Sequence, residues 1–159
     1  MFYFYSVAND QTNYPPPAFY FKVLVNGLEG KQEAGFEEVA GLDIKIGTEM
    51  IQESENQFTR KLPKALQYAN LVLKRGFIVG SPFMDWVNKA VQNFRFEPKM
   101  LHVVLMNEKG EPLVNWAFHN AYAVSVKISD LDPTENKYAI ETLELAYDYY
   151  DRTDQKINF

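Results

Sequence analysis

Residues 81–94 read SPFMDWVNKAVQNF, and this stretch decides the fold class of the 159-residue chain. Ser81 is a favourable helix N-cap, and Pro82 suits the first helical position because proline has no amide hydrogen to leave unpaired there. Apolar side chains then recur at the spacing of a single helix face, at Phe83, Trp86, Val87, Ala90, Val91 and Phe94. The stretch therefore predicts one amphipathic helix over residues 82–94.

The remaining segments alternate apolar and polar residues with a period of two, which is typical of β-strands. Residues 19–25 define a first strand that ends at a turn over residues 26–27. Further strands are expected at residues 36–40, 42–51, 71–74, 101–106, 114–118, 122–128 and 140–150. The sequence NEKG at residues 107–110 predicts a hairpin with Gly110 in the left-handed conformation. We therefore expect a mainly β (α+β) fold, an antiparallel barrel or sandwich partly covered by one helix.

The composition fits a single globular domain that needs no covalent cross-link. Its 12 Phe, 10 Tyr and 2 Trp make 15% of the chain, enough to fill a core and to leave some for a subunit interface. Lys and Arg total 16 against 21 Asp and Glu, so the net charge of -5 provides no global positive field to gather nucleic acid or anionic lipid. The absence of cysteine excludes disulfides, thiolate metal sites and a cysteine nucleophile.

Two terminal segments are expected to flank a β domain of residues 19–150. Residues 1–18 contain three consecutive prolines, which favour an extended path, and are interpreted as an N-terminal arm. Residues 151–159 are polar and are interpreted as a C-terminal tail. The opening residues lack the features of a signal peptide, and no segment approaches the roughly 20 apolar residues of a membrane span. The expected location during synthesis is therefore the cytoplasm.

Residues 49–62, EMIQESENQFTRKL, have no clean period and are followed by Pro63, where a sharp break is expected. A long polar excursion between two strands is either a solvated loop or an arm that becomes ordered against another subunit, and we favour the second interpretation. The basic pair Lys74-Arg75 is interpreted, together with Arg60-Lys61, as exposed strand charge that discourages stray edge pairing.

No group of residues has the pattern of an active site. The only histidines, His102 and His119, lie on the two expected strands of one hairpin, where histidine is more often a core or interface residue than a metal ligand. Glu37 and Glu38 are neighbours on a strand and face opposite ways, which does not suit an acid–base pair. The residues alone therefore predict no catalytic residue, no metal site and no cofactor.

Seven segments, in their order along the chain, resemble the tail-tube protein family of contractile phage tails and extracellular injection systems. They are YPPPAFYFKV, FEEVAGLDI, TEMIQESENQFTRKLP, YANLVLKRG, the helix start SPFMDW, LMNEKGEPLVNWAFHNAY and YAIETLELAYDYY. Together they span residues 14–150, nearly the whole domain. A single motif of this length would be weak evidence for the family, whereas seven motifs in the family's order are not expected in an unrelated β sequence.

The resemblance implies a barrel or sandwich of the phage tail-tube type, six copies of which form a ring whose sheets join into an inner tube wall. Rings stack coaxially in this family. The implied partners are further copies in a homohexameric ring, adjacent tube rings, spike and baseplate proteins, and the sheath or a cargo in the lumen. The implied location is a phage tail or an injection particle that can be released from the cell. Such obligate interfaces commonly bury roughly 2,000 Å2 or more, which would use the surplus aromatic side chains.

The resemblance also implies two sets of contact residues. The excursion at residues 49–62 would reach an adjacent ring or the baseplate, through Glu53, Glu55, Asn56, Phe58, Arg60 and Lys61. The helix would lie near the subunit boundary and contribute Trp86, Asn88 and Lys89.

Family members have two roles, and terminal extensions bear on the choice between them. A repeated tube subunit needs top and bottom surfaces that fit each other, whereas an initiating ring presents one face to a different partner, which suits extra terminal segments. We therefore favour a hexameric tube-initiating ring that joins the spike or baseplate to the stacked tube, with the main repeated inner-tube subunit as the alternative. Two hypotheses from other classes are a small β-barrel that binds an apolar ligand in a cavity, and a hydrolase that uses His102 or His119.

Overall fold

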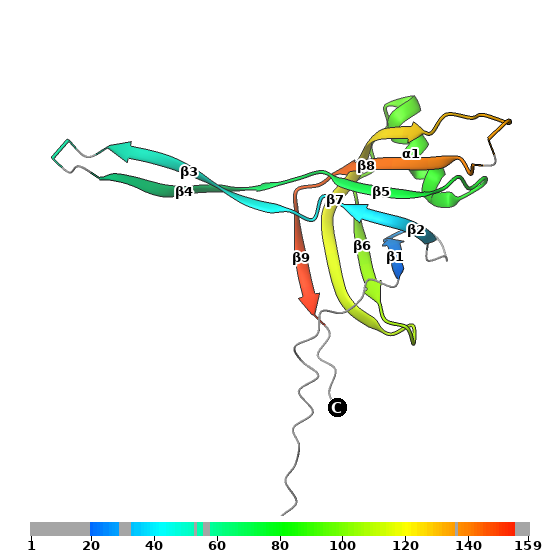
Figure 1. Cartoon of the computed structure of the whole chain (residues 1–159), viewed down its shortest axis with the longest axis horizontal. Coiled ribbons are helices and arrows are strands. Elements are labelled where there is room, and N and C mark those ends of the chain that lie inside the picture. The colour runs from blue at the N-terminus through cyan, green and yellow to red at the C-terminus, as the bar shows by residue number, and fades with distance from the viewer. Residues whose placement is uncertain (1–19, 29–32, 53, 56–57, 136, 155–159) are drawn as a thin grey trace, which may run out of the picture.

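The computed structural model describes residues 20–28, 33–52, 54–55, 58–135 and 137–154 (Figure 1). The expected N-terminal arm of residues 1–18 lies outside the described residues. In chain order the elements are β1 (Tyr20–Val25), β2 (Glu33–Ala40), β3 (Ile44–Gln52), β4 (Thr59–Tyr68), β5 (Leu71–Gly76), α1 (Pro82–Asn93), β6 (Lys99–Met106), β7 (Pro112–Ile128), β8 (Ile140–Ala146) and β9 (Tyr149–Asp154).

Six strands form a closed antiparallel barrel, which confirms the expected mainly β fold with one helix. They hydrogen-bond in the order β6-β1-β2-β5-β8-β7, and β7 pairs again with β6 to close the circle. Closure satisfies the backbone groups that an open sheet would leave unpaired at its edges. Among the described strands, free edges therefore remain only at β9 and in the hairpin formed by β3 and β4.

The strand β9 corrects two sequence expectations. The single strand expected at residues 140–150 is divided at Tyr147 and Asp148, and the second part pairs with β7 between Val114 and His119. Residues 151–154 belong to this second part, so they are sheet and not tail. Polar residues are tolerated here because β9 is an edge strand with mostly exposed side chains, which removes the alternation that would have marked a strand.

The barrel interior is filled with apolar side chains. Leu71 and Leu73 of β5 are fully buried, and they lie opposite the equally buried Leu145 and Leu143 of β8. This confirms that alternate residues of β5 point inward, as the period of two predicts. Buried apolar side chains from facing strands thus meet inside the barrel and form its core.

Helix α1 begins where the sequence predicts and packs against β7. The Oγ of Ser81 accepts a hydrogen bond from the amide of Met84 at 3.4 Å, and Pro82 opens the helix. The helix ends because Phe94 adopts the left-handed conformation with φ 52°, after which the amide of Arg95 donates to the carbonyl of Lys89 at 3.0 Å.

The buried face of α1 is shorter than predicted. The buried apolar members of the predicted face are Phe83, Trp86, Val87 and Ala90. Val91 and Phe94, at the end of the helix, are 42% and 82% exposed. The left-handed turn at Phe94 places its ring against Phe96, with centroids 4.8 Å apart, and not against the barrel.

An ion pair between Arg75 and Glu141 lies inside the barrel. The Nε of Arg75 is 3.1 Å from the Oε2 of Glu141, and the two side chains are 0% and 1% exposed. The guanidinium carbon also lies 5.1 Å and 5.6 Å from the ring centres of Phe36 and Phe83. The interpretation of Arg75 as an exposed strand charge is therefore wrong, because strand alternation turns it inward, whereas its neighbour Lys74 faces outward.

Strand β7 changes which residues face inward half-way along its length. Phe118 is buried, but beyond it the buried positions are Ala121 and Ala123, one residue out of step. Asn120 lies between them with φ 54°, a left-handed kink that shifts the alternation without ending the strand. The strands expected at residues 114–118 and 122–128 are therefore one strand, and Val124 faces outward.

Candidate assembly surfaces

A hairpin of β3 and β4 projects from one end of the barrel (Figure 1), and we call residues 44–68 the arm. In these two strands only Gly47 and Tyr68 are even half-covered. Large exposed apolar side chains of the arm are Ile44, Ile46, Met50, Ile51, Phe58, Leu62 and Leu66. An isolated two-stranded hairpin is marginally stable in water, and exposed apolar surface of this extent indicates an interface.

The arm is the outer half of one long ribbon rooted in the barrel. In β2 and β5 Ala40 lies opposite Val72, and the same register continues in the arm, where Ile44 lies opposite Tyr68. The break expected at Pro63 is absent, because Pro63 sits within β4 opposite Thr48, beside a bulge. Proline is accommodated there since β4 has a free edge that needs no amide donor.

Gly41 lies where the ribbon leaves the barrel, at the root of the arm. Its φ of +86° is in the left-handed region, and a Cβ at this position would lie 1.8 Å from the backbone carbonyl oxygen of Asn70. The two strands therefore approach each other more closely here than any side chain allows, and only glycine fits.

Two tyrosines hold the root of the arm: Tyr147 lies in the break between β8 and β9, and Tyr150 lies in β9. The hydroxyl of Tyr147 donates to the carbonyl of Ala69 at 2.7 Å, and that of Tyr150 donates to the carbonyl of Leu42 at 2.6 Å. Both rings pack edge-on against Tyr68. Burial raises the pKa of Tyr147 to about 12, because the charged phenolate is disfavoured there, with a further contribution from Tyr150. The arm is thus a braced projection.

The described residues of the predicted contact set gather at the end of the arm. Glu55, Phe58, Arg60 and Lys61 are all exposed, and Phe58 is 83% exposed. Glu53 and Asn56 lie outside the described residues. Sequence reasoning located this tip but missed the apolar side chains along the arm, for which the alternation of Ile44 and Ile46 was the available signal.

The predicted helix contacts divide into one core residue and two surface residues. Trp86 is 5% exposed, and its Nε1 donates to the carbonyl of Glu97 at 2.9 Å, so it belongs to the core of its own chain. Asn88 is half-buried and Lys89 is exposed. Of the three predicted helix contacts, only Asn88 and Lys89 are therefore accessible to a neighbouring subunit.

The two histidines have separate partners. The Nδ1 of His102 lies 3.3 Å from the Oδ1 of Asn115, whereas His119 stacks on Tyr149 and its Nε2 lies 2.9 Å from the Oδ2 of Asp151. In the part of the chain that the structure describes, no three metal-ligating residues come together. The two histidines therefore do not share one site in the described part of the chain.

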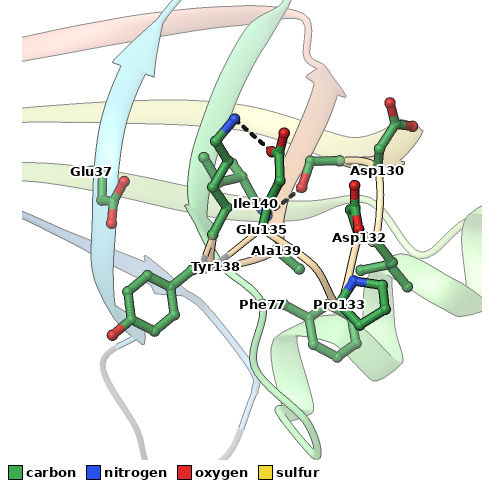
Figure 2. Close-up of a pocket in the computed structure, with 13 residues that line it drawn as sticks. Glu37, Phe77, Asp130, Asp132, Pro133, Glu135, Tyr138, Ala139 and Ile140 are labelled. Carbon is green, nitrogen blue, oxygen red and sulfur yellow. Dashed lines mark hydrogen bonds and ion pairs between the residues drawn. The ribbon is translucent and has the colours of Figure 1, made fainter.

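A surface pocket lies at the end of the barrel that carries the loop between β7 and β8, and we call it the loop pocket (Figure 2). It is lined mainly by that loop, with Glu37 of β2 and Phe77 after β5. The carboxylate of Glu37 lies on one flank in Figure 2, and those of Asp130 and Asp132 lie on the other.

A filled barrel, a covering helix and a long braced arm define a structural subunit whose exposed surfaces are built for assembly. A family model described as T4-like virus tail tube protein gp19 matches residues 17–151, and the chain belongs to this tail-tube family. It is a tail-tube protein of a contractile injection system or phage tail, which confirms the resemblance carried by the seven segments. No curated protein matches the sequence. The helix of the described chain is not long and apolar enough to cross a membrane.

Three solved structures are similar to almost the whole chain. A chain of the anti-feeding prophage (AFP) baseplate, 6-fold symmetrised, has a TM-score of 0.79 and 25% identity, over 89% of this chain and 97% of that chain. A chain of the sheath-tube complex of the extracellular contractile injection system PVC, in the extended state, has a TM-score of 0.75 and 29% identity, over 91% and 95%. A chain of the AFP tube terminating cap has a TM-score of 0.76 and 28% identity, over 94% and 99%.

Proposed function

We propose that this chain forms a homohexameric ring in the inner tube of a contractile injection particle or phage tail, and that this ring initiates the tube at the baseplate. The observation that carries the proposal is the arm, an exposed and partly apolar hairpin that Tyr147 and Tyr150 hold in one direction. A braced projection of this kind serves a contact with another subunit, ring or baseplate component. The function proposed is structural, with no catalytic step and no cofactor.

The similarity to known assemblies supports the partners in this proposal. The AFP baseplate structure was 6-fold symmetrised, and the similarity of its chain to this one, with a TM-score of 0.79, supports a ring of six copies. Spike and baseplate proteins, adjacent tube rings, and the sheath or a luminal cargo are the further partners proposed. Residues 1–18 and the residues after Asp154 are proposed as additional contacts with the baseplate neighbour.

A second candidate is the main repeated subunit of the inner tube. It is favoured by the PVC sheath-tube chain, whose identity to this protein is 29% compared with 25% for the baseplate chain. Both candidates use the same ring, and they differ in whether a ring accepts another ring of the same protein.

Negative-stain imaging of the purified protein, alone and with its spike neighbour, tests the proposal. Single rings, or monomers that form rings only on the spike, are expected for a tube-initiating subunit. Long tubes from the protein alone would identify the repeated subunit instead. A chain that stays monomeric with spike and tube partners present would contradict both candidates. A variant with a short turn in place of residues 46–66 should keep a folded barrel and fail to assemble.

A further inference from the structure

The loop between β7 and β8, which lines most of the loop pocket, lies at the opposite end of the barrel from the arm (Figure 1). Large exposed apolar side chains line this pocket. Phe77 is 48% exposed, Leu131 76% and Tyr138 90%. Figure 2 shows the rings of Phe77 and Tyr138 between the two flanks of carboxylates. Apolar groups gathered at a concave, solvent-facing surface indicate a contact with another protein surface.

The loop pocket is also negatively charged. Among its described lining residues are four carboxylates, Glu37, Asp130, Asp132 and Glu135, and one cation, Lys137, which pairs with Glu135 at 2.7 Å. The Oδ1 of Asp132 accepts hydrogen bonds from the hydroxyl and amide of Thr134 at 2.6 Å and 2.9 Å. These bonds lower the pKa of Asp132, so its carboxylate stays ionised. The pocket therefore suits a partner that is both apolar and basic.

One strand of the arm has that chemistry, whereas the carboxylates Glu49 and Glu55 lie on β3 and on the turn that follows it. The strand β4 carries Arg60, Lys61 and Lys64 and no carboxylate, and Phe58 stands exposed just before it. Lys64 is partly engaged, since its Nζ lies 3.5 Å from Glu49 across the hairpin. Arg60, which also has a partner within the chain, and Lys61 follow Phe58 nearer the tip, and both are exposed. An aromatic side chain followed by two cations thus complements aromatic side chains flanked by carboxylates.

The positions of the arm and the loop pocket determine which assembly a contact between them would form. The arm leaves one end of the barrel, and the loop between β7 and β8 lies at the other (Figure 1). Because this loop lines the loop pocket, a contact between arm and pocket joins two different surfaces on two copies. Such a heterologous, head-to-tail contact closes into a ring when the rotation between copies allows it.

We propose that the arm of one copy docks in the loop pocket of a neighbouring copy, with Phe58 against Phe77 and Tyr138 and the basic residues of β4 facing the carboxylates. The inference rests on the proposed ring, because six identical copies in a ring need a head-to-tail contact and this pair of surfaces supplies one.

Cross-linking between engineered cysteines tests the contact directly, because the native chain has no cysteine. Lys61→Cys in the arm and Asp130→Cys in the pocket are mixed and treated with a short bis-maleimide. We expect linked dimers to form at least about tenfold faster than in a mixture of Asp130→Cys with the control Lys109→Cys, whose cysteine lies on the hairpin between β6 and β7. Equal rates in the two mixtures would overturn the inference.

A charge exchange provides a second measurement. The arm variant Arg60→Glu/Lys61→Glu and the pocket variant Glu37→Lys/Asp130→Lys should each assemble about tenfold less well by sedimentation, since like charges then face each other. An equimolar mixture of the two should recover assembly, which also shows that both variants are folded. Lys109→Glu should assemble like the wild type. Unchanged assembly of either double variant, or no recovery on mixing, would overturn the inference.

The two proposals can fail separately. Six-copy rings of the wild type without preferential cross-linking would leave the ring standing and remove the arm–pocket contact. A chain that carries both Lys61→Cys and Asp130→Cys could instead cross-link preferentially into ladders that continue beyond six copies. That result would support the arm–pocket contact and contradict the closed ring.

Discussion

The hydroxyl of Tyr150 donates a 2.6 Å hydrogen bond to the backbone carbonyl of Leu42, which ties the last strand of the sheet to the root of the arm. Tyr147 makes the matching bond to the carbonyl of Ala69, which directly follows β4, the other arm strand. One tyrosine in the break between β8 and β9 and one in β9 thus bond to the two segments that lead into and out of the arm. The direction of the arm is therefore set by residues far away in the sequence.

Removal of both hydroxyls should loosen the arm more than the barrel. For Tyr147→Phe/Tyr150→Phe we expect a loss of about 1 kcal/mol in unfolding free energy per hydrogen bond. Amide exchange at the root of the arm should accelerate strongly while exchange in β6 changes little. Tyr138→Phe, at a residue that is 90% exposed, is the control and should change stability by less than about 0.5 kcal/mol. Equal acceleration throughout the chain would show that the tyrosines support the barrel as a whole.

Tyr147 should make stability depend on pH in the alkaline range. Its pKa is raised from 10.0 to about 12 in the folded chain, so the folded state holds this proton more tightly than the unfolded state. The stability that comes from the neutral phenol is fully present below pH 10 and is lost as the pH rises towards about 12. Urea unfolding across this range should show a smaller loss for Tyr147→Phe than for the wild type. Parallel curves would contradict the shift.

Gly41→Ala should destabilise the root of the arm severely. The new Cβ would meet the carbonyl oxygen of Asn70 at 1.8 Å, and this oxygen belongs to the backbone and cannot turn away. Gly80→Ala is a matched control, because Gly80 has a similar φ of +79° but no atom within 4 Å of a Cβ. We expect about 1–2 kcal/mol for the control from left-handed strain alone, and about 4 kcal/mol or more for Gly41→Ala. Similar losses in chemical denaturation would show that the strands move apart easily.

Trp86→Ala should cost about 3–5 kcal/mol, because it empties a buried site under the helix and removes the hydrogen bond to Glu97. Phe94→Ala, on the same helix but 82% exposed, should cost less than about 0.5 kcal/mol. Thermal and denaturant unfolding of the two variants measure the difference. If Trp86→Ala kept wild-type stability, the buried face of α1 would not be part of the core.

Removing one partner of the Arg75–Glu141 pair should destabilise the protein strongly, whereas replacing both partners by apolar residues should destabilise it much less. Glu141→Leu leaves the guanidinium of Arg75 buried without this carboxylate, and we expect a loss of about 3–5 kcal/mol. The double variant Arg75→Met/Glu141→Leu should recover most of that loss, because neither charge is then buried. A double variant as unstable as the single one would mean that the pair is needed for a unique packing of Phe36 and Phe83.

Local signals in the sequence predicted much of the barrel. The cap at Ser81 and the apolar spacing after it placed the helix to within a residue, and Gly110 takes the left-handed conformation that its hairpin requires, with φ 79°. These features depend on neighbours in the chain, which a sequence displays directly. The predicted contact residues Glu55, Phe58, Arg60 and Lys61 likewise share the end of one hairpin because they are close in sequence.

Features that depend on distant pairings were missed. Arg75 was assigned to the surface because its partner Glu141 is 66 residues away. The strand expected at residues 42–51 matches most of β3, but β4 was not recognised as a strand, because neither face of the arm is covered within the chain and burial imposes no alternation there. The change of the inward-facing residues after Asn120 follows its left-handed conformation, φ 54°, within a continuous strand, which the alternation of the sequence does not record.

The unbroken register from the barrel into the arm has a mechanical consequence. Figure 1 shows β4 running on into β5 in nearly the same direction. A pulling force along the arm would therefore act on β5 parallel to its neighbours β2 and β8. Many backbone hydrogen bonds would then resist the force at the same time, in shear, and would not break one after another. Tyr147 and Tyr150 pass part of the same load to the adjacent strands. The ribbon that extends from this small barrel is thus also the part of the fold that resists a pulling force.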